Sequence, residues 1–259
     1  ITAMLEPATA RSLPSTDQLY LRDAYQRTMA AEVIATDADR VALDRTVFYA
    51  TGGGQPHDTG MIEWDDVRWL VTDVRSDGKL LWHTLALQPG GAGPVAAAVP
   101  PIGATVTGTI DWARRHGLMR THTMLHVMGG VIWNRWGVPA TGGNMEPLSA
   151  RMDFGFGPLP ERFRDEVTAA VNAELEADRP ITVSFLDRGA ADVDPALLRT
   201  KVNLIPASVT QVRVVDIVGL DRQADGGTHV ASTAEVGRFE ITKTESKGKG
   251  NKRLRLKVS

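Results

Sequence analysis

The chain is organised around the segment Arg120-Thr121-His122-Thr123-Met124-Leu125-His126, which places two histidines four residues apart. This segment lies within residues 112–135, where apolar side chains recur at helical spacing, so we predict a long central helix there. The apolar stripe consists of Leu118, Leu125, Met128 and Ile132. Because a helix completes one turn in about 3.6 residues, both imidazoles project from the same face.

A second segment far downstream, Gln223-Ala224-Asp225-Gly226-Gly227-Thr228-His229, again places two possible ligands four residues apart. Its two glycines favour a tight loop over a helix. Two nitrogens from a helix and an oxygen–nitrogen pair from a loop form a plausible set of zinc ligands, namely His122, His126, Asp225 and His229. The helical pair alone is equally compatible with a structural role, and the second pair is what favours a metal centre.

Composition limits the chemistry of such a centre. The 259 residues contain no cysteine, so a metal would be held by nitrogen and oxygen donors. The apolar fraction of 42% and charged fraction of 23% are typical of a globular domain. No apolar run approaches the roughly 20 residues of a membrane helix, and no signal segment precedes the first strands. We therefore expect a cytoplasmic protein without membrane contact; its oligomeric state is not encoded in any pattern we recognise.

The pattern of elements predicts an α+β fold in two parts. Short β-like segments with turns rich in glycine and aspartate predict a small β-barrel-like amino-terminal domain over residues 1–110. In residues 111–259, helices and strands cluster instead of alternating, which predicts a two-layer α/β core with a mostly antiparallel sheet. A second amphipathic helix is expected over residues 160–177. Residues 138–149, which include Thr141, are expected to form a loop bordering the metal.

Two glycine-rich stretches need an explanation. Gly52-Gly53-Gly54 precedes Gln55 without the lysine of a Walker loop, so a nucleotide-binding P-loop is excluded. Gln55 is either a ligand-contacting residue or a structural turn amide. Gly129 and Gly130 follow the histidines inside the predicted helix, where each glycine costs about 1 kcal/mol relative to alanine. Close approach of a substrate or tight helix packing would explain them, and we favour packing.

The carboxy-terminal region is basic although the net charge of the chain is only −2. Residues 243–257 contain seven basic side chains and one acidic side chain. A solvated surface is the simplest interpretation of such a run. The alternative is a phosphate-contacting surface that binds RNA, with Lys247, Lys249, Lys252 and Arg253 as the candidates.

Four separated motifs together resemble the free-standing alanyl-tRNA editing proteins of the AlaX type and the editing domain of alanyl-tRNA synthetases. The motifs occupy residues 48–60, 119–126, 223–230 and 245–250. The resemblance implies a metal-dependent editing (deacylase) domain in residues 111–259. It also implies hydrolysis of tRNA(Ala) that has been wrongly charged with serine or glycine, with the tRNA acceptor end as the partner.

The resemblance also assigns the ligands of the implied zinc. His122, His126 and His229 match the family's zinc-binding histidines, whereas Asp225 occupies a position where the family usually has cysteine. A carboxylate can bind zinc, but it is a harder donor than a thiolate, so other divalent metals should be tolerated better.

Within this framework we expect Gln55, Thr123, Thr141 and Thr228 to contact the substrate. The metal would either activate water or position the substrate, and the sequence leaves both roles open. Two other functions remain possible at this stage. Two histidines and a carboxylate are also the ligand set of non-haem iron oxygenases. A non-catalytic tRNA-binding module with a structural metal would show the same motifs.

Overall fold

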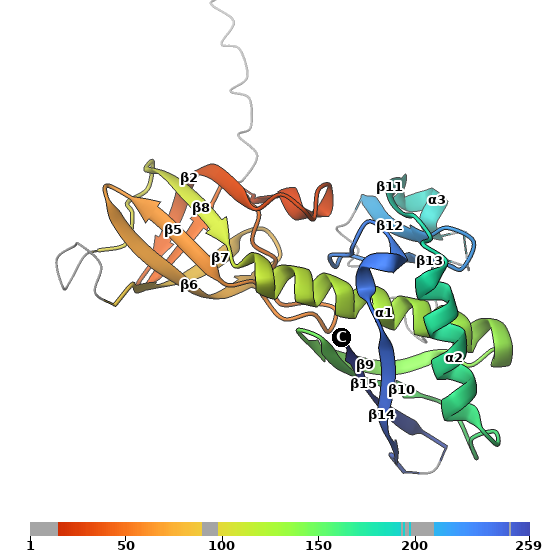
Figure 1. Cartoon of the computed structure of the whole chain (residues 1–259). Coiled ribbons are helices and arrows are strands. Elements are labelled where there is room, and N and C mark those ends of the chain that lie inside the picture. Colours follow the sequence, from red (N-terminus) through yellow and green to blue (C-terminus); the bar gives the residue numbers. More distant parts are fainter. Residues whose placement is uncertain (1–14, 90–97, 193, 195–196, 198–209, 249) are drawn as a thin grey trace, which may run out of the picture.

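The computed structural model describes residues 15–89, 98–192, 194, 197, 210–248 and 250–259. Its strands and few helices form an α+β architecture, as predicted, and every sheet of more than two strands is antiparallel. Figure 1 shows a barrel at one end, a long helix α1 leading away from it, and two further sheets around that helix. No helix in the part of the chain that the structure describes is long and apolar enough to cross a membrane.

Six strands form a closed barrel in the order β2-β3-β7-β6-β5-β8. This arrangement confirms the predicted barrel-like character of the amino-terminal part. Side chains alternate between the interior and the surface, most regularly in β8, because successive residues of a strand point to opposite faces. The strands are β2 (Thr28–Asp37), β3 (Arg40–Leu43), β5 (Gly60–Trp64), β6 (Val67–Ser76), β7 (Leu81–Leu87) and β8 (Thr105–Ile110).

Three short elements flank the barrel strands in the sequence. Strand β1 (Asp17–Gln18) pairs in parallel with β4 (Arg45–Thr46), and the 3-10 helix η1 (Leu19–Leu21) follows β1 directly. The glycine-rich segment 49–58 lies between β4 and β5. It contacts the second half of the chain, since the backbone nitrogen of Met145 donates to the carbonyl oxygen of Gly54 at 3.3 Å.

Helix α1 (Trp112–Trp136) has a capping residue at each end. Asp111 accepts a hydrogen bond from the backbone nitrogen of Arg114, which caps the amino end. Gly137 ends the helix in a left-handed conformation, with φ of 63°, which glycine adopts without a Cβ clash. Both ends agree with the predicted central helix to within one residue.

A buried ion pair ties α1 to the glycine-rich segment. The guanidinium of Arg115 donates to both carboxylate oxygens of Asp58, and neither side chain is exposed. Arg115 also donates to the carbonyl oxygens of Ala24 and Val47, while Asp58 accepts from the backbone nitrogen of Tyr49. Because removing one partner of such a pair leaves a buried charge, the pair fixes the segment relative to the helix.

Two sheets and a second helix surround α1. A four-stranded sheet has the order β14-β15-β10-β9, and a three-stranded sheet has the order β11-β12-β13. The strands are β9 (Ala140–Glu146), β10 (Ser149–Phe154), β11 (Ile181–Asp187), β12 (Gln211–Ile217), β13 (Asp221–Ala224), β14 (Phe239–Ser246) and β15 (Lys252–Val258). The remaining elements are α2 (Phe163–Glu176), α3 (Arg188–Asp192) and the 3-10 helix η3 (Thr233–Val236).

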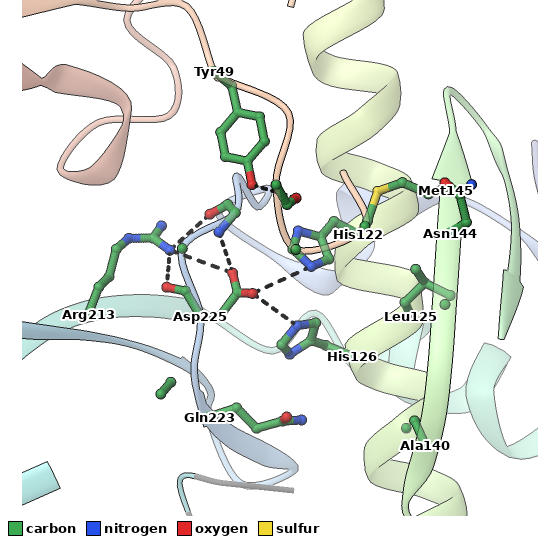
Figure 2. A pocket seen from close by; sticks show the side chains of 18 of the residues that line it. Tyr49, His122, Leu125, His126, Ala140, Asn144, Met145, Arg213, Gln223 and Asp225 are labelled. Carbon is green, nitrogen blue, oxygen red and sulfur yellow. Dashed lines mark hydrogen bonds and ion pairs between the residues drawn. The ribbon is translucent and has the colours of Figure 1, made fainter. Parts of the chain in front are cut away.

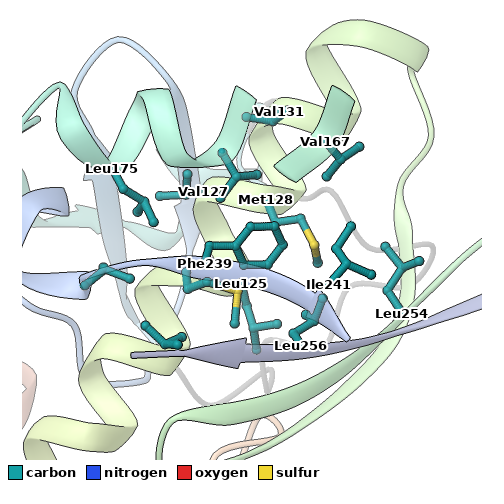
Figure 3. Close-up of a cluster of buried hydrophobic side chains, with 14 of the residues drawn as sticks. Leu125, Val127, Met128, Val131, Val167, Leu175, Phe239, Ile241, Leu254 and Leu256 are labelled. Carbon is teal, nitrogen blue, oxygen red and sulfur yellow. The ribbon is translucent and has the colours of Figure 1, made fainter. Parts of the chain in front are cut away.

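The main core lies between α1, α2 and the four-stranded sheet. Figure 3 shows apolar side chains from both helices meeting those of β14 and β15. Val127, Met128 and Val167 from the helices and Ile241 and Leu254 from the strands are almost fully buried. One face of α1 thus serves the core, which leaves another face for the histidines.

Two expectations for this part of the chain need correction. Residues 140–146 form strand β9, paired with β10 from Ser149 onward, and are not a loop. Cross-strand hydrogen bonding outweighs the poor strand propensity of Gly142 and Gly143. Helix α2 begins at Phe163 and not at residue 160, because Arg162 has a φ of 60° and interrupts the helical backbone. The sequence also predicts a short helical turn at residues 195–198, which falls mostly outside the described residues.

The barrel ends at Ile110 and α1 begins at Trp112. A boundary between independent domains at residues 110 and 111 stays a prediction, since the Arg115–Asp58 pair links the two parts.

Candidate metal centre and its cavity

Three imidazoles and one carboxylate from distant parts of the chain converge on a common point. His122 and His126 project from α1, while Asp225 and His229 come from the loop after β13. One potential ligand atom from each residue lies within 4.8 Å of all the others. Figure 2 shows the Asp225 carboxylate facing both helical imidazoles. The structure therefore brings together the four residues selected from the sequence.

The distances around the carboxylate suit a small divalent cation. Asp225 Oδ1 lies 3.6 Å from His122 Nε2 and 3.9 Å from His126 Nε2. Asp225 Oδ2 lies 3.1 Å from His229 Nε2. Tetrahedral ligands at about 2.0–2.1 Å from zinc are separated by about 3.3–3.4 Å from one another, so the donor set fits a single ion with small adjustments.

Outer hydrogen bonds orient two of the rings. His126 Nδ1 lies 3.3 Å from Asp221 Oδ2, and His229 Nδ1 lies 3.1 Å from Thr123 Oγ1. Gln223 Nε2 donates to the same Asp221 oxygen at 2.7 Å. In both rings the Nε2 atom consequently faces Asp225, an arrangement that metal-binding histidines commonly show.

His122 is oriented by packing against the loop. A Cβ on Gly227 would lie 2.2 Å from His122 Cε1, so only glycine lets the loop approach the ring this closely. Its Nδ1 atom is buried and has no hydrogen-bond partner among the described residues. The Nε2 atom of His122 faces Asp225, at 3.6 Å from Oδ1, as the Nε2 atoms of the other two rings do.

Burial and mutual charge set the protonation of the site. Burial lowers the pKa of His229 to about 4 and lowers the pKa of His122 well below its ordinary value. Burial alone would also lower the pKa of His126, but the hydrogen bond to Asp221 and the charge of Asp225 raise it. Burial alone would raise the pKa of Asp225, but the imidazoles, His122 first, hold it well below its usual range. The ionised Asp225 and the neutral rings of His122 and His229 are in the form that binds a metal, whereas His126 must lose its proton to bind one.

Arg213 on β12 holds in place residues 225–229, which follow β13 and are called the ligand loop below. Its Nη1 atom donates to the carbonyl oxygens of Asp225 and Gly227 at 2.8 Å each, and its Nε atom donates to Leu21 O at 2.8 Å. The guanidinium thus joins the ligand loop to the barrel end of the molecule. Sequence reasoning identified neither Arg213 nor Asp221, because neither stands at a ligand-like spacing and each acts only through tertiary contacts.

A cavity of about 1000 Å³ opens over the cluster. His122, His126 and Asp225 line it, and His229 does not, so His229 lies behind the other three as seen from the cavity. The walls come from the glycine-rich segment, from α1 and from β9. Figure 2 shows Tyr49, Asn144 and Met145 among them.

Of the four residues expected to contact the substrate, Thr141 lines this cavity and the other three do not. Gln55 is 1% exposed, and its amide exchanges two hydrogen bonds with Thr228. Thr123 bonds to His229 and accepts from the backbone nitrogen of Val230. The geometry favours positioning roles for these three, and substrate contact by any of the four stays a prediction.

The basic candidates lie on the β14–β15 hairpin, apart from Lys249, which falls outside the described residues. Arg253 makes a bidentate ion pair with Asp153, so its guanidinium is already engaged. Lys252 Nζ donates to Ser246 Oγ at 2.8 Å, and Lys247 is exposed. Their role in RNA binding stays a prediction, with Lys247 and Lys252 better placed than Arg253.

Comparison with known families matches both halves of the chain. Residues 15–114 match the family "tRNA synthetases class II (A)". Residues 212–255, which contain the ligand loop and most of the basic β14–β15 hairpin, match the "Threonyl and Alanyl tRNA synthetase second additional domain". Fold and motifs together define a module related to the editing regions of these synthetases.

Sequence identity to individual proteins shows which family within this class the chain belongs to. The chain is 34% identical over 242 residues to the alanyl-tRNA editing protein AlaX-M of Saccharolobus solfataricus, covering 92% of this chain and 97% of that protein. It is 33% identical to the AlaX-M protein of Methanosarcina acetivorans with the same coverage. The chain belongs to the AlaX-type family of alanyl-tRNA editing proteins.

Alanine–tRNA ligases are also similar. The chain is 33% identical to the ligase of Pyrobaculum arsenaticum, but it spans only 27% of that protein's length. The similarity to the ligases therefore concerns one part of them.

Proposed function

We propose that the protein is a metal-dependent hydrolase that removes serine or glycine from wrongly charged tRNA(Ala). The observation that carries this proposal is the convergence of His122, His126, Asp225 and His229 at the wall of a large cavity, in a chain that spans 97% of an alanyl-tRNA editing relative. Such an enzyme would act where translation takes place, so the cytoplasmic location stays part of the proposal.

The reaction is hydrolysis of the ester between the amino acid and the terminal ribose. The oxygen of water bonds to the ester carbonyl carbon, the bond from that carbon to the ribose oxygen breaks, and the ribose oxygen takes a proton. The products are a free amino acid and uncharged tRNA. No oxidant or further substrate is needed.

The four side chains would hold a divalent ion, with zinc as the best match to three nitrogens and one oxygen. When bound, the ion supplies Lewis-acid chemistry, polarising a carbonyl oxygen and making water more acidic. The harder carboxylate of Asp225 would admit other divalent metals more readily than a thiolate would.

The chain's own residues prepare the site. Asp221 and Thr123 fix the orientation of His126 and His229, and Gln55 holds Thr228 beside the last ligand. Arg213 holds the loop so that Asp225 and Gly227 stay in place. This pre-set geometry lets the reacting ester bind without reorganising the protein.

A deacylation assay tests the proposal. tRNA(Ala) charged in turn with serine, glycine and alanine is incubated with the metal-loaded protein and with protein treated with a chelator. We expect loss of serine or glycine, retention of alanine, and restoration of activity when zinc is added back. Retention of alanine follows if the site hydrogen-bonds a group that alanine lacks, which would be the case for serine.

The variant His126→Ala distinguishes a metal-dependent deacylase from a non-catalytic tRNA-binding module with a structural metal. We expect it to keep its circular dichroism spectrum and tRNA binding while losing deacylation. Failure of the folded, metal-loaded protein to cleave any of the three charged tRNAs would refute the proposal. Equal cleavage with and without chelator would refute its dependence on metal.

A further inference from the structure

One face of α1 carries a row of cavity-lining residues that leads away from the metal ligands. His122, His126, Gly129 and Trp133 all line the cavity and follow one another at intervals of four, three and four residues. This spacing places them on a single helical face. With a rise of 1.5 Å per residue, the backbone of Trp133 lies about 10 Å beyond that of His126 along the helix.

Trp133 differs from its neighbour Trp136, although both lie in the last turns of α1. Trp136 packs against Phe156 and Phe163, with ring centroids 6.1 and 5.2 Å away. Trp133 lines the cavity and is 38% exposed. The indole of Trp133 therefore presents part of its surface to the cavity.

The two adjacent glycines of α1 also differ. A Cβ on Gly130 would lie 3.2 Å from Asp221 Cβ, so Gly130 serves the packing that we expected from the sequence. A Cβ on Gly129 would meet only Met152 Cε, at 3.9 Å. Packing thus does not require glycine at position 129. Because Gly129 has no side chain, it leaves open space above the helix between His126 and Trp133.

We propose that Trp133 stacks on the terminal base of the charged tRNA while Gly129 makes room for the ribose. This inference rests on the proposed function and extends it to the nucleoside. In an aminoacylated tRNA the ribose lies between the ester and the base. On the helix, Gly129 lies between the metal-binding imidazole and the indole in the same order.

The size of the cavity supports a ligand larger than an amino acid. At about 1000 Å³ it is at the upper end of the range for sites that enclose drug-sized ligands, and a seryl group would fill a small part of it. Bases stack well on tryptophan because both present flat π-faces, and removal of such a ring weakens binding by about 5- to 150-fold.

The test uses the full chain and a non-hydrolysable probe, adenosine that carries serine through a 3′-amide, with serine amide as the probe lacking a nucleoside. We expect Trp133→Ala to weaken binding of the nucleoside probe by about 5- to 150-fold. Trp133→Phe should recover most of that loss, since phenylalanine keeps an aromatic face. Binding of serine amide should be the same in all three proteins.

Two further measurements make the result independent of folding. Gly129→Ala should raise Tm, because alanine is the better helix former. The same variant should nevertheless bind the nucleoside probe more weakly. The probe should quench tryptophan fluorescence in the unmodified chain and quench it less in Trp133→Phe. Asn134→Ala, an exposed neighbour outside the cavity lining, is the matched control and should bind both probes normally.

The experiments distinguish failure of the stacking role of Trp133 from failure of the deacylase assignment. If the unmodified chain deacylates seryl-tRNA(Ala) while Trp133→Ala binds the nucleoside probe within twofold of it, the stacking role is wrong and the deacylase assignment stands. If the unmodified chain cleaves no charged tRNA(Ala) but Trp133→Ala shows the expected loss of probe binding, the nucleoside site stands and the deacylase assignment falls.

Discussion

At the scale of single residues, Asp225 is the position where this chain departs from the pattern that its family resemblance implies. The carboxylate is held by more than its neighbouring imidazoles, since Oδ2 also accepts from the backbone nitrogen of Gly227 at 2.7 Å. Arg213 Nη1 lies 3.7 Å from the same oxygen. These interactions fix the oxygen atoms in place and also draw charge away from them.

Replacing this carboxylate should change both metal affinity and metal preference. We expect Asp225→Cys to favour zinc over cobalt or manganese more strongly than the unmodified chain does, because a thiolate is the softer donor. Asp225→Ala should lower zinc affinity by more than roughly 10- to 100-fold. That range is the usual loss when a residue that only hydrogen-bonds to a metal ligand is removed. Competition against a chromophoric chelator measures both effects. Asp216→Ala, a carboxylate on β12, is the control, and an unchanged zinc affinity in Asp225→Ala would contradict the assignment.

The contrast between Asp225 and Asp221 shows how far sequence reasoning reaches at this scale. His122 and His126 share a helical face by spacing alone, and Asp225 and His229 repeat that spacing beside two glycines. Asp221 has no such signature. It reaches His126 because β13 lies beside α1, which depends on the packing of the whole region.

At the scale of elements, the barrel contains a titratable group in its interior. His83 on β7 is fully buried, with Nε2 2.9 Å from Thr46 Oγ1 and Nδ1 3.3 Å from Val41 O. Burial lowers its pKa to about 4 from an ordinary value of 6.5. The folded barrel thus keeps this ring neutral under conditions in which the unfolded chain would protonate it.

This difference makes the barrel sensitive to acid. Between pH 6.5 and about 4, the unfolded chain binds a proton at His83 that the folded chain does not bind, so stability present at neutral pH is lost as the pH falls. The loss attributable to His83 is at most about 3 kcal/mol. Urea unfolding at pH 7 and pH 5 should show a smaller pH effect in His83→Gln than in the unmodified chain. An equal pH effect in His83→Gln and in the unmodified chain would contradict this prediction.

Most elements were predictable because they follow from local periodicity. The alternating strands of the barrel and the apolar stripe of α1 are examples. Strand β9 was not predictable, since Gly142 and Gly143 disfavour a strand and only pairing with β10 imposes one. Helix α2 was found, but its start was not, because the backbone of Arg162 is set by the preceding turn.

At the scale of the whole molecule, we propose that the basic β14–β15 hairpin contacts the tRNA. If Lys247 and Lys252 bind phosphates, the double variant Lys247→Ala/Lys252→Ala should bind tRNA(Ala) more weakly at low salt. The slope of log K against log salt should fall by about 0.7–0.9 for each lysine that no longer neutralises a phosphate.

Filter binding across a salt series measures that slope. The control Arg40→Ala/Arg68→Ala removes two exposed charges from the barrel, where each arginine pairs with a neighbouring carboxylate. An equal change of slope in both double variants would indicate general electrostatic attraction and would contradict a specific role for the hairpin.

Four side chains from distant parts of the chain converge on one point, and we propose that a metal ion binds there. X-ray absorption at the zinc edge of the metal-loaded chain tests this convergence most directly. We predict one zinc per chain, bound by nitrogen and oxygen donors at about 2.0–2.2 Å with the scattering pattern of several imidazoles and no sulfur. A shell of six oxygens, or a spectrum that is the same in His126→Ala, would contradict it.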